Sequence, residues 1–311
     1  MKQELRAQEQ QEIRNRFNSN LYYEFLEFLD VKENTLETYK KGLKQFFIYL
    51  LENDIKNPTR KDVANFRDHI KETHKTGTAQ TYLASVRAFF KWTDSEGYYP
   101  NIAQYVKSVK QAQGFKKDYL TSEQAKDVLN AVNRTNVQGL RDYAIISLML
   151  TTGLRTIEVA RANVEDLRTL GNSTVLYVQG KGHDTKDDYV KVPKPVEMAI
   201  RTYLRAVQSQ KESPLFMSLD HKNKGNRLTT RSLSRICKKY MIEAGYESDR
   251  LTAHSLRHTS VTLALLNGNT LEQVQQMARH KNINTTMIYN HSLEKEKNPC
   301  YDSVSSMLFE A

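Results

Sequence analysis

The sequence predicts a mainly helical protein with a small β-sheet, divided into two domains. Three observations support this fold class. Apolar residues recur at three- and four-residue spacing along much of the chain, which is typical of amphipathic helices. Two short β-branched and aromatic runs flank a single turn and indicate a hairpin. A lysine-rich stretch without apolar periodicity separates two regions that are each long enough to bury a core.

The first domain is expected over residues 17–106, after a Gln-, Glu- and Arg-rich extension at 1–16. One helix there has a single apolar face, formed by Leu36, Tyr39, Leu43, Phe46, Phe47 and Leu50. Lysines, including Lys41 and Lys44, fall on its other side. A second helix, from about 78 to 93, has a polar stripe of Gln80, Arg87 and Lys91. A charged helix face is most often simply solvated, and that interpretation stays open for both helices.

Residues 107–118 have the composition of a basic linker, and the second domain is expected over 119–311. Thr121 or Ser122 can cap its first helix. Residues 140–152 predict a buried helix rich in Ile, Leu and Met. The runs TVLYVQ (174–179) and DYVKV (188–192) predict a hairpin around the turn GKGHDTK, and helices resume near Pro195.

Composition narrows the class of protein. The formal net charge of +10 favours a polyanionic partner such as nucleic acid. No apolar run approaches the roughly 18–20 residues that a membrane span requires. The charged N-terminus lacks the apolar core of a signal peptide, so we expect a cytoplasmic protein. Two cysteines, Cys237 and Cys300, make neither a disulfide framework nor a zinc cluster.

The second domain contains the side chains that phosphodiester cleavage requires. Such a reaction needs a nucleophile, cations on the non-bridging oxygens and a proton donor for the leaving alkoxide. Guanidinium suits the second task, because its planar fork meets two oxygens at once. In chain order the candidates are Arg155 in TGLR, Lys181 in GKG, His254 and Arg257 in HSLR, His280 in ARH, and Tyr289 in MIY.

This order of residues resembles the Arg…Lys…His-x-x-Arg…His…Tyr signature of the tyrosine recombinases, which include phage integrases and Xer recombinases. The stretch MARHKNINTTMIYNH is similar to the family's Leu-Gly-His…Thr-Thr…Tyr-x-His segment. The resemblance covers roughly residues 17–300 and implies a two-domain DNA clamp, a helical core-binding domain followed by a catalytic domain. One residue departs from the pattern: Arg279 stands where the family usually has glycine, and there it could contact phosphate or point to solvent.

The resemblance also implies roles for the matching residues. Tyr289 would attack the scissile phosphate and form a 3′-phosphotyrosyl link. Arg155 and Arg257 would hold the non-bridging oxygens. Lys181 would protonate the 5′-hydroxyl as it leaves, with Lys186 in the same turn as its competitor.

The two histidines of the signature have assisting roles in the same family pattern. His254 would assist proton transfer at the nucleophile, and His280 would hydrogen-bond the phosphate. Tyr301 is the nearest rival nucleophile to Tyr289. His254 and His258 have a spacing that can ligate zinc, but the sequence offers no HExxH motif and no evident third ligand. The resemblance implies no metal and no nucleotide cofactor, because a phosphotyrosine conserves the energy of the broken bond.

The expected partner is double-stranded DNA. The candidate contacts in the first domain are Lys41, Lys44, Gln80, Arg87 and Lys91. Recombination between two duplexes needs four strand cuts, so a homo-tetramer on two DNA sites is implied. The tail SVSSMLFEA (303–311) has Val304, Met307 and Leu308 at helical spacing. It could cap its own domain, but the resemblance favours exchange of the tail between protomers.

The sequence therefore predicts a site-specific recombinase for the integration, excision or resolution of a DNA element. Two alternatives belong to other classes of function. One is a site-specific DNA-binding factor that no longer cleaves, against which the complete signature argues. The other is a type IB topoisomerase, which shares the chemistry but relaxes supercoils without joining two sites. The compact first domain and the tail favour the recombinase.

Overall fold

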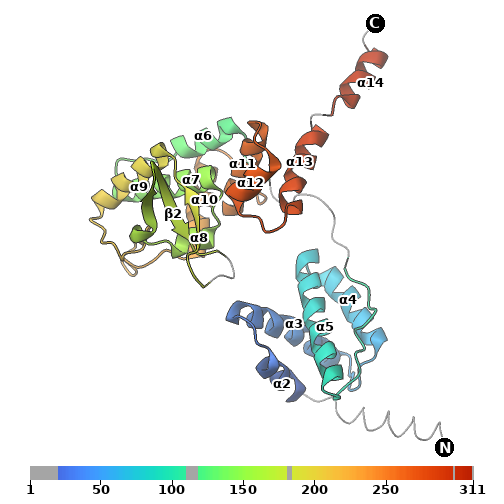
Figure 1. Cartoon of the computed structure of the whole chain (residues 1–311). Helices are drawn as coiled ribbons and strands as arrows, with labels where there is room; N and C mark the ends of the chain where they lie inside the picture. The colour runs from blue at the N-terminus through green and yellow to red at the C-terminus, as the bar shows by residue number, and fades with distance from the viewer. Residues whose placement is uncertain (1–19, 110–117, 181–183, 297, 310–311) are drawn as a thin grey trace, which may run out of the picture. The chain divides into compact units, whose positions relative to one another are not determined.

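The computed structural model describes residues 20–109, 118–180, 184–296 and 298–309. The chain divides into two compact units, residues 1–113 and 114–311 (Figure 1). The first unit is helical, and the second is mostly helical with a small antiparallel sheet, so the predicted fold class is confirmed. No helix in the described ranges has the length and apolar character needed to cross a membrane.

The first unit is built around an aromatic core. Its helices are α2 (Asn20–Phe28), α3 (Glu33–Glu52), α4 (Arg60–Thr73) and α5 (Thr76–Ser95). The predicted apolar face of α3 is the buried one, and the Phe46 ring meets those of Phe66 and Phe90 at 5.0 and 5.7 Å. Gly42 lets α3 approach α5, because a Cβ there would lie 2.5 Å from the Ser85 Oγ. The amphipathic pattern therefore places this core correctly.

The segment after α5 stays attached to the first unit as far as the described chain runs. Tyr99 is buried and its hydroxyl donates to the Pro58 carbonyl at 2.7 Å. Val106 and Val109 are buried in the same core. Val109 is the last described residue before the gap at 110–117, and it lies within the stretch that the lysine-rich composition marks as a linker.

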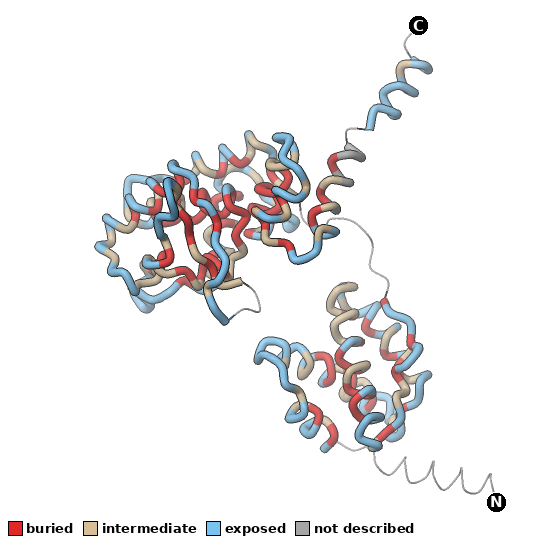
Figure 2. Tube along the Cα trace, viewed as in Figure 1, coloured by how far each residue is buried: buried red, intermediate tan, exposed pale blue. Residues whose placement is uncertain are grey.

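The second unit is built around a central helix, α7 (Val137–Thr152). Most of its residues are buried, and buried residues are red in Figure 2. Ile145, Leu148 and Met149 on this helix are fully or almost fully buried. Thr121 is the N-cap of the preceding helix and accepts from the Gln124 amide. The other helical elements around the core are α6 (Ser122–Asn130), α8 (Thr156–Arg161), η1 (Val164–Asp166), α9 (Lys194–Ala206), α10 (Thr230–Glu243) and α11 (Ala253–Leu266).

The sheet has three antiparallel strands in the order β1 (Leu167–Leu170), β2 (Ser173–Val178) and β3 (Asp188–Lys191). The predicted hairpin is β2–β3, in which Leu176 pairs with Val190. Strand β1 was not predicted from the sequence. Its residues are mostly exposed and lack the apolar alternation that marks a half-buried strand. Its position comes from pairing with β2, in which Leu167 lies opposite Leu176.

Three helices complete the chain: α12 (Leu271–Ala278), α13 (Asn284–Glu296) and α14 (Cys300–Phe309). A separate small core joins α11, α12 and α13 through Val261, Val274, Ala278 and Tyr289. None of the described residues of α14 is buried. The small core therefore fixes α13, and with it Tyr289, against the rest of the second unit.

Candidate active site

Arg155 is positioned by the end of α7 and the start of α8. Gly153 ends α7 in the left-handed region, at φ 62°, which glycine adopts without steric cost. Arg155 is the N-cap of α8, and its backbone N–H donates to the Glu158 Oε2 at 2.7 Å. Its guanidinium Nη1 donates to the Glu158 Oε1 at 3.0 Å. The side chain remains 31% exposed, so it can still reach a ligand.

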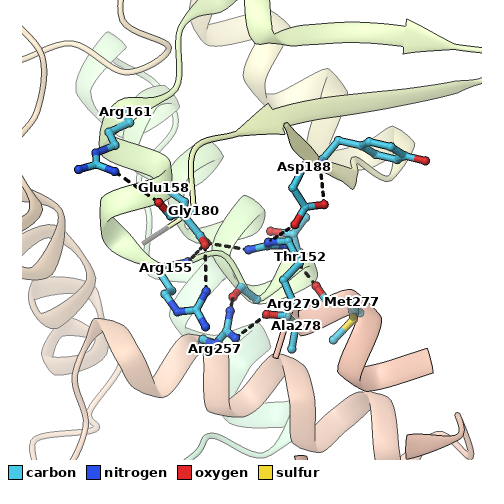
Figure 3. Close-up of polar contacts among 12 residues, drawn as sticks. Thr152, Arg155, Glu158, Arg161, Gly180, Asp188, Arg257, Met277, Ala278 and Arg279 are labelled. Atoms are coloured by element: carbon cyan, nitrogen blue, oxygen red, sulfur yellow. Dashed lines mark hydrogen bonds and ion pairs between the residues drawn. The ribbon is translucent and has the colours of Figure 1, made fainter. Parts of the chain in front are cut away.

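Arg257, on α11, is the most deeply buried cation of the site, with 1% of its surface exposed. It donates to the Gly153 carbonyl and to the Ala278 carbonyl, both at 2.5 Å (Figure 3). Burial, followed by the charge of the nearby Arg155, lowers the pKa of Arg257 to about 10. The guanidinium is still charged at neutral pH. Two cations held close together favour an anion between them.

His280 enters the site through the turn that ends α12. Arg279 adopts a left-handed conformation there, and its N–H bonds to the Gln276 carbonyl while that of His280 bonds to Gln275. This is the hydrogen-bond pattern of a Schellman cap. His280 Nδ1 lies 2.9 Å from the Thr286 hydroxyl. Burial lowers the pKa of His280 to about 4, aided by Arg257 and Arg155, so the imidazole is neutral at neutral pH.

Tyr289 lies on α13 with only 5% of its surface exposed. Its ring stacks on that of His280, with centroids 6.3 Å apart and planes 20° apart, and lies 5.1 Å from the ring of His258. Burial raises the pKa of the phenol, while Arg257 and Arg155 lower it. Both guanidiniums therefore act electrostatically on the phenol, and the structure brings Arg155, Arg257, His280 and Tyr289 together.

His254 lies in the first turn of α11 and is exposed. Its ring meets that of His258 edge-on at 4.8 Å. With Arg155 and Ser234 it lines a small cavity beside the site. Burial, and to a smaller extent the charge of His254, lowers the pKa of His258 to about 4. Within the described ranges, no three His, Cys, Asp or Glu side chains are grouped so as to hold a metal.

Lys181 lies outside the described residues. Its competitor Lys186 is described, and its Nζ lies 2.5 Å from the Oδ2 of Asp166, a carboxylate that is 3% exposed. Asp166 directly precedes β1, so this ion pair holds Lys186 near the start of that strand. Tyr301, the rival nucleophile, is exposed on α14 and 69% accessible.

The candidate DNA contacts of the first unit fall into two groups. Lys41, Lys44 and Lys91 are exposed. Gln80 and Arg87 are partly buried, and they donate to the segment that leaves the unit: Gln80 to the Val109 carbonyl at 2.8 Å, and Arg87 to the Ser108 hydroxyl at 2.9 Å. Arg87 also donates to the Val106 carbonyl. Two residues of the polar stripe on α5, Gln80 and Arg87, therefore hold residues 106–109 against the first unit, a contact that sequence reasoning missed.

Sequence reasoning also missed a basic groove along α10. It is lined by Arg231, Arg235, Lys238 and Lys239, and it shares Ser234, Thr252 and Ala253 with the cavity that contains Arg155 and His254. The groove thus adjoins the site directly. The signal in the sequence is the run of cations at three- and four-residue spacing in TRSLSRICKK, which could equally have marked a solvated helix face.

Comparison with known proteins gives matches over nearly the whole chain. The pattern described as "Phage integrase family" matches residues 118–296, and "Phage integrase, N-terminal SAM-like domain" matches residues 20–97. The chain is 29% identical over 290 residues to the tyrosine recombinase XerD of Listeria monocytogenes serotype 4b, covering 88% of this chain and 94% of that protein.

Solved structures with the same fold include site-specific recombinases on DNA. XerH bound to a palindromic difH substrate, in a post-cleavage complex, has a TM-score of 0.72 at 22% identity and covers 87% of this chain and 79% of that one. A lambda integrase tetramer bound to a Holliday junction has a TM-score of 0.68 at 16% identity, covering 87% and 76%.

Proposed function

The chain belongs to the phage integrase family, and from that premise we propose how its site cuts and rejoins DNA. It is a site-specific tyrosine recombinase, a DNA breaking and rejoining enzyme. One observation carries the assignment of its chemistry. The phenol of Tyr289 lies in the field of two guanidiniums, Arg155 and Arg257, beside a neutral imidazole, His280. This is the combination of groups that in-line attack on a phosphodiester requires.

Tyr289 supplies the nucleophile. Its phenolic oxygen attacks the scissile phosphorus, a phosphorus–oxygen bond to the tyrosine forms, and the bond to the 5′-oxygen breaks. The phenol gives up its proton and the departing 5′-oxygen takes one, so the step is balanced. In the joining step the 5′-hydroxyl of a partner strand attacks the 3′-phosphotyrosine and releases Tyr289. The number of phosphoester bonds is unchanged, which is why no nucleotide is consumed.

The cations divide the remaining work. Arg155 and Arg257 hold the non-bridging oxygens, whose charge grows in the transition state. Lys181 gives its proton to the 5′-oxygen. Lys186 is engaged with Asp166, which supports Lys181 over Lys186 in this role. His254 assists removal of the phenolic proton, and His280 donates a hydrogen bond to the phosphate.

DNA binding is divided between the two parts of the chain. We assign residues 17–106 to a core-binding domain and 119–311 to the catalytic domain, joined by the basic linker 107–118. The exposed Lys41, Lys44 and Lys91 are the direct phosphate contacts of the first domain. Gln80 and Arg87, which hold the exit of the chain, reach DNA only if their contacts with residues 106–109 open.

The basic groove of α10 extends the phosphate path. It adjoins the cavity that contains Arg155, so a strand held at the scissile phosphate can continue along the exposed Arg231 and Arg235. Each such contact releases condensed counterions and should steepen the salt dependence of binding.

We further assign the working assembly to a homo-tetramer on two DNA sites, with the tail of one protomer docked on another. The exposed apolar residues of α14 support this: Val304, Met307, Leu308 and Phe309 are 54% to 85% accessible. The solved lambda integrase tetramer on a Holliday junction, which has the same fold, supports four protomers. Integration, excision and resolution of a mobile element all fit this assembly.

A nicked suicide substrate tests the function. The nick lets the short strand beyond the cut diffuse away, so the covalent protein–DNA adduct accumulates. A DNA-binding factor without cleavage would give no adduct. A type IB topoisomerase would give an adduct and relax supercoiled plasmids, but would not join two sites. The proposed recombinase gives the adduct and exchanges strands between two copies of its own site.

A further inference from the structure

We propose that Arg279 is a positioning residue for DNA cleavage, which acts through Glu158 on the guanidinium of Arg155. The inference rests on the proposed function and adds to it a residue outside the family's signature. Arg279 stands where the family usually has glycine. Its side chain is not directed to solvent and is not left unpaired for a phosphate, because it pairs with Glu158. Figure 3 shows it reaching across the site to Glu158.

Glu158 is the centre of the arrangement. Its side chain is 0% exposed. Oε1 accepts from the Arg155 Nη1 at 3.0 Å, and Oε2 accepts from the Arg155 backbone at 2.7 Å and from the Arg279 Nη2 at 2.7 Å. Two guanidiniums from different parts of the fold, the start of α8 and the end of α12, therefore hold one buried carboxylate.

The charge balance gives this contact a consequence for the phosphate. If Arg155 were the sole partner of Glu158, the pair would be neutral, and the carboxylate would oppose the attraction of Arg155 for a phosphate. Arg279 supplies a second cation, so the group of three carries a net positive charge beside Arg257. The Arg279 Nε is 3.6 Å from Asp188, but that carboxylate is 52% exposed and so screened by water.

The backbone at Arg279 indicates that the side chain matters. Its φ of 55° and ψ of 48° lie in the left-handed region, where any residue other than glycine, asparagine or aspartate is disfavoured. Glycine would close the Schellman cap without this cost. The side chain offsets it with the ion pair to Glu158, and only 10% of its surface is exposed.

The position next to His280 extends the effect to a second site residue. The same cap that holds Arg279 aims His280, and both residues line one open depression with Arg155 and Glu158. Arg279 thus connects the turn that carries His280 to the turn that carries Arg155. We place its action on Arg155, because the shared carboxylate is the direct contact.

The test is single-turnover cleavage of the suicide substrate by Arg279→Gln and Arg279→Gly. Each should be slower than wild type by about ten- to hundredfold, by analogy with the loss seen when a group that orients a metal ligand is removed. In an Arg155→Lys background, adding Arg279→Gln should cause little further loss, because both changes act on one group. Full additivity of the two losses, or a wild-type rate in both Arg279 variants, would overturn the proposal.

A second substrate separates positioning of a phosphate ligand from a structural role. A methylphosphonate at the scissile position lacks one non-bridging oxygen and its charge, so it needs less of the Arg155 guanidinium. The ratio of wild-type to Arg279→Gln rates should shrink several-fold on this substrate. An unchanged ratio would mean that Arg279 acts on the fold in general and would refute the proposal.

Two controls keep the outcomes distinct. Gln208→Gly introduces glycine at another left-handed position, φ 51°, outside the site, and should leave cleavage unchanged. Arg279→Gly should fold, since glycine suits this backbone, and thermal melts will verify it. If the wild-type protein itself forms no adduct, the recombinase chemistry is wrong. If wild type cleaves and both Arg279 variants match it, only the role of Arg279 is wrong.

Discussion

At the scale of single residues, Tyr289 shows how packing prepares a nucleophile without ionising it. Burial raises the pKa of the phenol, and the nearby guanidiniums of Arg257 and Arg155 lower it. We expect Tyr289→Phe to bind DNA normally and to form no covalent adduct, because only the phenolic oxygen is lost and the ring still stacks on His280. Gel shifts and covalent trapping measure the two properties separately. A trapped adduct with the Phe variant would transfer the role to another residue, such as Tyr301.

The two arginines should respond differently to the same substitution. Arg155→Lys and Arg257→Lys should each lower the cleavage rate about 10²–10³-fold, equivalent to roughly 2.7–4 kcal/mol for one lost transition-state contact. Arg257→Lys should also lower the melting temperature, because Arg257 bonds to the Gly153 and Ala278 carbonyls inside the fold. Arg155 is more exposed and should affect melting less. Single-turnover rates set beside thermal melts test both statements, and a near-wild-type rate would refute that arginine's role.

His280 should make the protein less stable in mild acid. Its pKa is lowered to about 4 in the fold, from 6.5, mainly by burial. Between these values the unfolded chain takes up a proton that the folded chain does not, so the free energy of unfolding falls as pH falls. From pH 7 to pH 5 the loss is at most about 2 kcal/mol.

Denaturant unfolding at both pH values tests this effect. His280→Gln keeps a hydrogen-bonding group for the Thr286 hydroxyl but has no titrating group, so its unfolding free energy should fall less between pH 7 and pH 5. His221→Gln, at an exposed position, is the matched control and should retain the wild-type pH dependence. An equal fall in the His280→Gln and wild-type proteins would show that His280 is not the source.

At the scale of elements, the sequence predicts those helices and strands that have a recognisable local residue pattern. The α3 face was predicted from apolar spacing, the buried α7 helix from its Ile, Leu and Met content, and the β2–β3 hairpin from β-branched and aromatic runs around a turn. All three are confirmed. Strand β1 has no such pattern, since its edge position leaves it mostly exposed. Neighbours far apart in the sequence are also invisible to periodicity, which is why the contact of Arg87 with Ser108 was missed.

The candidate site divides in the same way. Its residue types and order could be identified from local motifs, because each functional side chain lies in a short sequence motif of its own. The contacts between those motifs could not be predicted from the sequence. Glu158 pairs with Arg279, which lies 121 positions later in the chain. Nothing in the sequence around either residue alone specifies that pairing. The left-handed backbone at Arg279 was hidden for a related reason, since glycine is the residue that usually signals it.

At the scale of the whole molecule, α14 has an apolar surface that no other part of the described protomer buries. Its apolar residues Val304, Met307 and Leu308 are all exposed in the described protomer. Exposed apolar surfaces of this kind often mark interaction sites. A tail that docks on a neighbour would also couple the active sites, because occupancy at one protomer then biases the position of α13 and Tyr289 in the next.

We therefore expect deletion of residues 303–311 to weaken assembly more than single-site binding. The stability of the free monomer should change little, because the stripe makes no buried contact within the described protomer. The complex of several protomers on DNA should dissociate more readily, because each loses an apolar interface. Light scattering of the DNA complex, set beside thermal melts of the free protein, measures the two effects. A truncated protein that melts early but still assembles normally would place the tail on its own domain, and strand exchange would then need another means of communication between protomers.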